Sequence, residues 1–432
     1  MTVPYDFFQF LAKEPLTSRL AESLFNLHAQ PPLLNLGLGL ALKLERATGW
    51  APERTLLALH LALGVVATLA LVALLVRLGV HPWLRRLVMV LVLLDPAFYI
   101  FLLLFFYSFH ELVLLLLAAV AVQRFLAARQ VRFYAAACAC LVTLTYTRSL
   151  FHFAWTLAIL AALALAARPE GLRRPVLGLL AASALLVLAW PVKNLLRFDF
   201  FGSSSWQGYN LSQGLIREYP PIWAAFVLKD APGQAEARER LAQTVPERFR
   251  SIPVLAAATK ESGSPNWNHY SIILLSRGLE GPVLRRLREN PGLLLAKAAA
   301  NYRQAVIDPA RDPFLHSLEE QAPNPLAWIW LRTHEQGAYL YFGKDPQTGP
   351  LPGFAWLLPP ALALVLVQIV RRRRSDPAGA GTAAFLLGAI LWVLAMVLFV
   401  DGREGNRMRF STQPLLLVSV AWALTRSPRS ES

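Results

Sequence analysis

The chain has 432 residues, of which 56% are hydrophobic and only 16% are charged. A soluble protein of this length could not reach such values without exposing large apolar patches, so the composition indicates a membrane protein. The formal net charge is +15 at pH 7. Because the arginines gather in short loops between apolar segments, where they set orientation in a bilayer, we exclude nucleic acid as a partner.

Residues 1–54 precede the first long apolar segment and contain one shorter apolar stretch, Pro31–Leu44. With about 14 residues and Pro31-Pro32 at its start, this stretch favours an interfacial helix over a crossing. A crossing helix is the alternative, and it would place residues 1–30 in the cytoplasm. The charge pattern described next places residues 1–54 outside. Such an external segment normally follows a span, so we expect that a first transmembrane helix is missing upstream of Met1, or that Met1 begins a degenerate copy.

Residues 55–190 and 353–432 contain the apolar segments that predict a transmembrane helix bundle. Short loops rich in arginine follow every second segment, near Arg77, Arg129, Arg173 and Arg371, and the positive-inside rule makes this end of the bundle cytoplasmic. The predicted spans are Thr55–Arg77, Leu84–Leu94, Glu111–Ala127, Phe133–Thr147, Leu150–Ala167, Pro175–Trp190, Phe354–Val370, Ala380–Val400 and Thr412–Leu424. The expected fold class is an all-α polytopic membrane protein.

Residues 191–352 form a mostly polar insertion that the same rule places outside. No alternating strand pattern is present, so helices and loops are expected. Three serines and Trp206 lie between two glycines, and Tyr209 follows. This composition suits a loop that approaches an anion or a sugar. The run Ser264–Tyr270 has a similar aromatic and polar character, and Pro282–Val306 is amphipathic and basic, typical of a helix on the membrane surface.

Several cations fall on the outer face, where the positive-inside rule disfavours them. Arg148 lies in a tight turn, Lys193 follows Trp190-Pro191, and Arg407 and Arg409 lie in the loop before the last span. A phosphate-bearing lipid headgroup is the simplest partner, because guanidinium groups grip phosphate oxygens bidentately. The alternative is that these cations pair with nearby carboxylates or snorkel to ordinary lipid phosphates.

Three motifs in this order resemble those of the GT-C class of integral membrane glycosyltransferases, which includes protein O-mannosyltransferases and lipid A aminoarabinose transferases. They are His28-Ala-Gln30-Pro31-Pro32-Leu-Leu-Asn35, then Trp190-Pro191-x-Lys193-Asn194 through Ser205-Trp206, then Glu404-x-x-Arg407-x-Arg409. The resemblance covers most of the chain and implies a GT-C-like bundle with a mainly helical periplasmic insertion.

The resemblance also implies an inverting transfer, on the outer face, of a sugar from a polyprenyl-phosphate donor to a glycan, lipid or protein acceptor. Asp6, with Glu14 second, would act as the general base toward the acceptor. The donor phosphate would be held by Arg148, Lys193, Arg407 and Arg409. His28, Gln30, Trp206, Tyr209 and His269 would orient donor or acceptor. The composition favours a bacterial inner membrane, with membrane lipid as the surrounding partner.

Two other functions remain open: a flippase for lipid-linked oligosaccharide, and a non-catalytic scaffold that keeps the fold. Internal repeats are typical of transporters, and we find none in the sequence. Cys138 and Cys140 are two residues apart in an apolar helix and cannot pair with each other. No cofactor is predicted. Dependence on a divalent metal stays open, because no cluster of metal ligands is present in the sequence.

Overall fold

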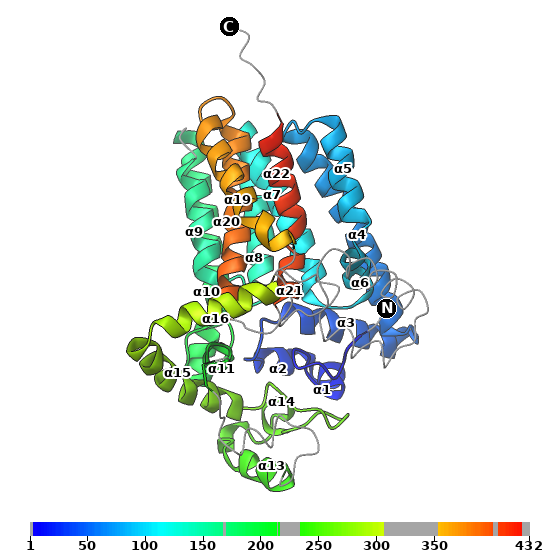
Figure 1. Cartoon of the computed structure of the whole chain (residues 1–432). Helices are drawn as coiled ribbons and strands as arrows, with labels where there is room; N and C mark the ends of the chain where they lie inside the picture. The colour runs from blue at the N-terminus through cyan, green and yellow to red at the C-terminus, as the bar shows by residue number, and fades with distance from the viewer. Residues whose placement is uncertain are drawn as a thin grey trace.

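The computed structural model describes residues 3–166, 170–213, 215–216, 234–305, 353–400 and 405–425. Their regular secondary structure is entirely helical, and the described residues add only one isolated bridge, between Thr259 and Pro265. The helices form an upright bundle above a second layer of helices (Figure 1). The all-α prediction is therefore confirmed for the described residues.

Each predicted span overlaps a helix of the upper bundle within the described residues. Four of these helices, α4, α7, α10 and α20, are long and apolar enough to cross a membrane, and α5 with α6, bent by 53°, gives a fifth candidate. The bundle consists of α4 (Pro52–Arg77), α5 (Pro82–Leu93), α6 (Pro96–Leu103), α7 (Tyr107–Ala128), α8 (Val131–Thr147), α9 (Phe153–Leu165), α10 (Glu170–Phe198), α19 (Gly353–Arg372), α20 (Pro377–Phe399), α21 (Gly405–Phe410) and α22 (Gln413–Leu424).

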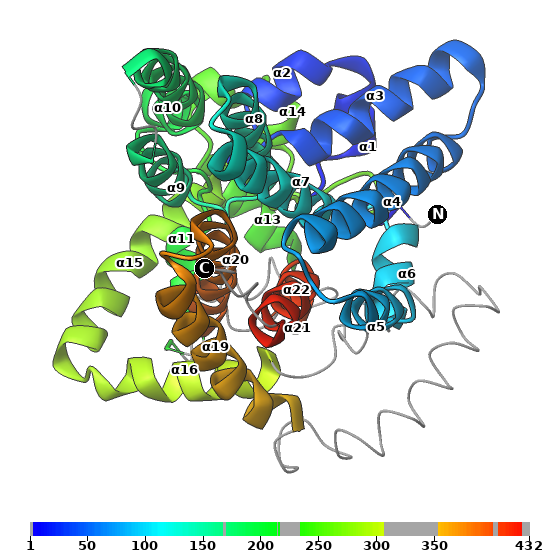
Figure 2. The same cartoon turned by 90° about the horizontal axis from the view of Figure 1, so that it is seen from above.

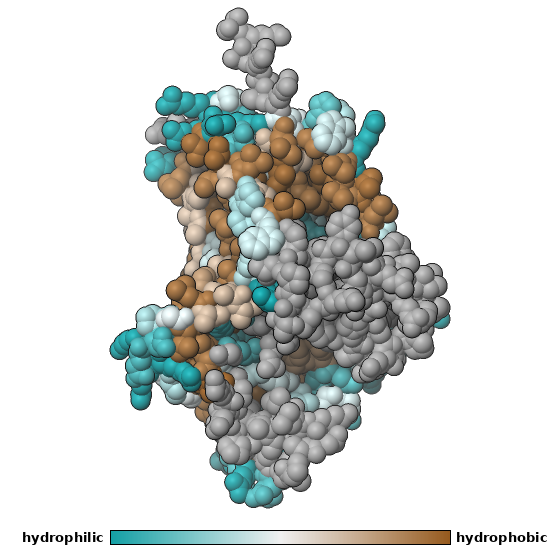
Figure 3. Space-filling view, in the orientation of Figure 1, coloured by the Kyte–Doolittle hydropathy of each residue, from teal (hydrophilic) through white to brown (hydrophobic). Residues whose placement is uncertain are grey.

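Helix α7 is the most enclosed of the long apolar helices, whereas α4 and α10 turn much of their apolar surface outward. Leu69 of α4 and Leu185 of α10 are 63% and 75% exposed. On the face seen in Figure 3, hydrophobic side chains cover much of the upper bundle. Outward-facing leucines at mid-helix would be unfavourable in water and are compatible with contact to lipid, so the helices support a multi-pass membrane protein.

The predicted end of the sixth span at Trp190 is wrong, because α10 continues through Pro191 to Phe198. Proline removes one backbone donor, yet neighbouring groups in a membrane helix can compensate. Here the following loop packs back on the added turns. Asn194, which is buried, donates its side-chain amide to the Gly202 carbonyl at 2.7 Å. Lys193 therefore lies within a helix.

The N-terminal residues form α1 (Lys13–Ser18), α2 (Leu20–Phe25) and α3 (Leu33–Thr48) beneath the bundle. Helix α3 has 16 residues and lies across the end of the bundle, lengthwise in a view down the bundle (Figure 2). It is too short to span about 30 Å of hydrocarbon, and its orientation agrees with the predicted interfacial helix.

The described part of the insertion continues this lower layer. It contains α11 (Gln207–Ser212), α13 (Gln234–Gln243), the 3₁₀ turn η1 (Glu247–Phe249), α14 (Pro253–Ala256), α15 (Ser271–Glu289) and α16 (Gly292–Ala305). Within the predicted amphipathic stretch Pro282–Val306, α15 ends at Glu289 and α16 covers Gly292–Ala305, and Val306 lies outside the described residues. Its arginines Arg285, Arg286 and Arg288 are exposed, and a position at the membrane surface stays a prediction.

The arginine-rich turns lie at the end of the bundle opposite the lower layer. They join α4 to α5, α7 to α8 and α19 to α20, and hydrophilic side chains gather at this end (Figures 1 and 3). That the lower layer lies on the outer side stays a prediction from the positive-inside rule.

Candidate functional site

A cavity of about 510 Å³ lies where the lower layer meets the bundle. Its size falls within the range of about 300–1,000 Å³ that is usual for small-ligand sites. Its wall combines aromatic rings, side-chain amides, hydroxyls and a guanidinium. The lining residues are Phe8, Gln9, Gln30, Tyr107, Arg148, Ser149, Leu150, His152, Ser203, Ser204, Trp206, Gln207, Tyr209, Asn210, Gln213, Trp267, Trp392, Met396, Val400 and Met408.

Arg148 supplies a guanidinium at the cavity wall, directly after α8. Its side chain is 4% exposed and bonds through Nη1 to Glu111 of α7, with an N–O distance of 3.0 Å. The guanidinium carbon also lies 4.1 Å from the centre of the Tyr107 ring. Burying one of these two charges without the other would be costly, so the ion pair holds the guanidinium in place at the cavity wall.

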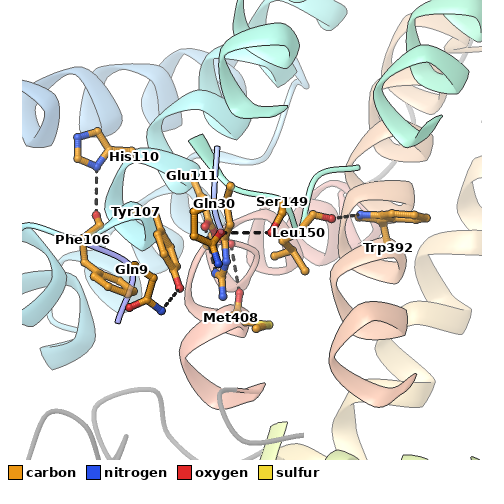
Figure 4. A network of polar contacts seen from close by, with 12 residues as sticks. Gln9, Gln30, Phe106, Tyr107, His110, Glu111, Ser149, Leu150, Trp392 and Met408 are labelled. Carbon is orange, nitrogen blue, oxygen red and sulfur yellow. Dashed lines mark hydrogen bonds and ion pairs between the residues drawn. The ribbon is translucent and has the colours of Figure 1, made fainter. Parts of the chain in front are cut away.

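The turn that carries Arg148 is fixed from two sides. Ser149 donates its hydroxyl to the Gln30 side-chain oxygen at 3.3 Å, and Trp392 of α20 donates its indole N–H to the Leu150 carbonyl at 2.8 Å (Figure 4). The turn is thus bonded to Gln30 near the N-terminus and to Trp392 of α20, and these bonds restrain the backbone next to Arg148.

An aromatic cluster forms another part of the wall. The ring of Trp267 lies 5.6 Å from Trp206, 5.3 Å from Tyr209 and 6.0 Å from Phe8, measured between centroids. Trp206 also donates its indole N–H to the Trp267 carbonyl at 3.2 Å. The predicted sugar-contacting residues Trp206 and Tyr209 are therefore brought together, and they line the cavity.

The loop from Thr259 to His269, called the 259–269 loop below, fastens the N-terminal segment to the insertion. Lys260 is 5% exposed, and its ammonium donates to the Tyr5 carbonyl at 3.0 Å and the Phe7 carbonyl at 2.6 Å. Burial lowers the pKa of Lys260 to about 8, against the opposing charges of Asp6 and Glu261. These contacts hold the backbone just ahead of Phe8.

The same loop reaches the segment a second time. The Asn268 side-chain oxygen accepts from the His28 and Ala29 N–H groups at 2.9 and 3.0 Å, and its amide donates to the Asn26 carbonyl at 3.2 Å. The buried Asn268 side chain thus bonds backbone groups within residues 26–29, and these bonds fix the backbone that leads to Gln30 at the cavity wall.

Three predicted residues lie behind the wall and do not line the cavity. His28 bonds through Nδ1 to the Ser205 hydroxyl at 2.8 Å, His269 bonds to Ser271 at 2.6 Å, and Lys193 donates to the Leu27 carbonyl at 2.6 Å. Burial, and next the Lys193 cation, keep the pKa of His28 well below the usual value, and burial lowers that of His269 to about 4. Both imidazoles are neutral at pH 7.

The two predicted bases do not line the cavity. Asp6 is exposed two residues before Phe8. Glu14 is exposed on α1, where its carboxylate accepts a hydrogen bond from the Ser18 hydroxyl at 2.8 Å. Arg409 lies on α21 beside Met408, which does line the cavity, but Arg409 itself does not. The side chain of Arg407 lies outside the described residues.

Of the predicted site residues, the structure therefore gathers Arg148, Gln30, Trp206 and Tyr209 around one cavity. Sequence patterns missed Tyr107 and Trp392, which lie in apolar segments and carry no local signal. Gln9 was also missed, although it follows Asp6 closely. Trp267 lies in the predicted aromatic and polar run Ser264–Tyr270, in which His269 is the predicted site residue. Within the described residues, no group of three or more histidine, cysteine or acidic side chains is placed to hold a metal ion.

No protein-family model, curated protein or solved structure matches the chain. The functional interpretation therefore depends on the geometry of the cavity and on the motifs in the sequence.

Proposed function

We propose that the chain is a membrane glycosyltransferase that transfers a sugar from a polyprenyl-phosphate donor to an acceptor at the outer face of a bacterial inner membrane. The observation that carries this proposal is the cavity between bundle and lower layer, which combines the Arg148 guanidinium with an aromatic and amide wall. Its position at the end of the spanning helices lets a lipid chain remain in the membrane while its headgroup enters.

Arg148 is the proposed partner of the donor phosphate. Its guanidinium lines the cavity, and a guanidinium is a planar fork of N–H donors suited to phosphate. During transfer the bond between the anomeric carbon and the phosphate oxygen breaks, and negative charge grows on the leaving polyprenyl phosphate. A fixed cation at this point stabilises that charge.

An inverting transfer needs a base that takes the proton of the acceptor hydroxyl while its oxygen attacks the anomeric carbon. Asp6 remains the proposed base, because the backbone at Tyr5 and Phe7 is held by Lys260 and leads directly into the wall residues Phe8 and Gln9. Glu14, whose backbone N–H is bonded to Glu261, is the second candidate.

The test is transfer of radiolabelled sugar from synthetic polyprenyl-phosphate donors by purified protein in nanodiscs. We expect Asp6→Asn to abolish transfer while donor binding persists, and Glu22→Gln, a matched substitution of an exposed carboxylate on α2, to leave it near wild type. Full activity of Asp6→Asn would remove Asp6 as the base. Movement of donor across the bilayer with no transfer by the wild type would replace the proposal with a flippase.

A further inference from the structure

The cavity wall has an uneven chemical composition that bears on the kind of sugar it accepts. Among the described lining residues none is acidic, and the only permanently charged one is Arg148, whose charge is already matched by Glu111. A charged substituent on a bound sugar would thus lack a partner, and burying an unpaired charge is costly. The described wall favours a ligand whose sugar is uncharged.

The polar groups that are present suit hydroxyls. Five lining residues carry side-chain amides, each of which offers both donors and an acceptor: Gln9, Gln30, Gln207, Asn210 and Gln213. Sugar hydroxyls likewise donate and accept, so amides can satisfy them in either sense. Amides provide this match without any net charge.

Three polar side-chain atoms of the lining residues are buried and make no hydrogen bond. Gln9 is 3% exposed, and its amide donates to the Tyr107 hydroxyl at 2.9 Å, but its carbonyl oxygen has no partner. The Gln213 carbonyl oxygen and the Ser203 hydroxyl also lack partners. Because these atoms are buried, they do not face the cavity, and the case for a neutral ligand depends on the lining amides and on the charges of the described wall.

The aromatic cluster supplies the remaining contact. The rings of Phe8, Trp206, Tyr209 and Trp267 lie within 6.0 Å of a neighbour in the cluster and present a rigid apolar surface next to the amides. The C–H face of a pyranose is apolar and its edges are polar, which fits a wall with rings on one part and amides on another.

We infer that the cavity selects a neutral, hydroxyl-rich sugar, such as a hexose, against amino sugars and uronic acids. This inference rests on the proposed function and names the substrate class of the same site. Arg148 serves the phosphate, which all these donors share, so it does not separate them. The uncharged amides and the rings make the selection.

The experiment compares three donors with one polyprenyl chain, carrying a neutral hexose, an amino sugar or a uronic acid, in the nanodisc transfer assay. We expect the neutral donor to be used at least about tenfold faster than either charged one, since a charged sugar would be buried unpaired. Gln207→Glu, on the exposed first turn of α11, should shift preference toward the amino-sugar donor, whereas the matched Gln207→Leu should not. Gln213→Glu provides a second position should the first variant misfold.

A wild type that uses a charged donor as well as the neutral one would overturn the inference while leaving the glycosyltransferase proposal intact. Transfer from none of the three would instead count against the proposed function. In that case quenching of tryptophan fluorescence by neutral and charged methyl glycosides still tests the cavity. Equal binding of both classes, or binding of neither, would overturn the selection of a neutral sugar.

Discussion

The buried ion pair of Arg148 and Glu111 fixes the one permanently charged side chain among the described residues of the cavity wall. Arg148 can be selected from the sequence because the predicted topology places it on the side of the membrane where cations are disfavoured. Its partner could not be read in the same way, since Glu111 is 37 positions earlier and lies at the start of an apolar helix. Only the packing of α7 against the end of α8 joins them.

Glu111→Gln should destabilise the protein by about 3 kcal/mol, because it leaves a guanidinium buried without its counter-charge. Unfolding of the purified protein in detergent measures this loss. Combining Glu111→Gln with Arg148→Gln should recover much of the stability, since neither charge is then buried alone. If the double variant is no more stable than Glu111→Gln, the two charges are not coupled in the folded state.

The low pKa of His269 predicts a loss of stability in acid. The folded-state pKa of about 4 lies below the ordinary 6.5, so between these values the unfolded chain binds a proton that the folded chain does not. Stability is therefore full above pH 6.5 and falls as the pH drops toward 4, by on the order of 3 kcal/mol for this group.

Unfolding midpoints measured from pH 7 to pH 4 check this expectation. His269→Asn should flatten the dependence, although His28, whose pKa is lowered in the same direction, keeps part of it. The matched control is His81→Gln, at an exposed position before α5. An unchanged acid profile in His269→Asn would mean that this imidazole does not stay neutral in the folded protein.

At the scale of elements, the short helix α11 owes its position to the close approach of one glycine to α15. Gly208 donates its backbone N–H to the Ser276 hydroxyl at 2.8 Å, and a Cβ on Gly208 would collide with the Ser276 carbonyl. The neighbours Gln207 and Tyr209 line the cavity, so this contact also sets the cavity wall.

Gly208→Ala should separate α11 from α15, with a destabilisation of about 1–3 kcal/mol that is typical of overpacking, and should weaken sugar transfer. Gly278→Ala is the matched control on α15, because a Cβ there meets nothing within 4 Å. Comparing thermal unfolding and transfer for the two variants isolates the contact. If Gly208→Ala and Gly278→Ala show the same thermal stability and the same transfer rate, the close contact between α11 and α15 is not needed for either property.

Helix existence could be predicted well from sequence, and helix ends less well. Each span must satisfy its own backbone in lipid, so a long apolar run permits little besides a helix. At Asp95-Pro96 the chain bends between α5 and α6, and Asp95 caps α6 by accepting from the Ala97 N–H at 2.9 Å and also accepts from the Gln413 side-chain amide. Pro191 was wrongly interpreted as an end, because the loop that supports α10 beyond it is not visible in the local pattern.

At the scale of the whole molecule, the site depends on contacts between distant segments. Gln9 meets Tyr107, Ser149 meets Gln30, and the Leu150 carbonyl meets Trp392. Arg148, which breaks the positive-inside rule, and Trp206, which lies in a loop of serines and glycines, could be selected from sequence, and both line the cavity. Ordinary residues in ordinary segments, such as Tyr107 and Trp392, become site residues only through the fold, so sequence alone could not select them.

The orientation of the molecule is the broadest prediction, since it decides which compartment the cavity faces. The arginine-rich turns lie at one end of the bundle and the cavity lies at the other, so the positive-inside rule places the cavity outside the cytoplasm. Ser262, exposed in the 259–269 loop, and Arg173, exposed at the start of α10, mark the two ends.

Single cysteines at these positions, in a background with Cys138 and Cys140 replaced by alanine, report the orientation. We expect Ser262→Cys to react with a membrane-impermeant maleimide in cells whose inner membrane is intact, and Arg173→Cys to react only after that membrane is opened. The reverse pattern would place the cavity in the cytoplasm. A donor delivered outside could then not reach Arg148, and the proposed outer-face transfer would have to be abandoned even if the cavity binds sugar.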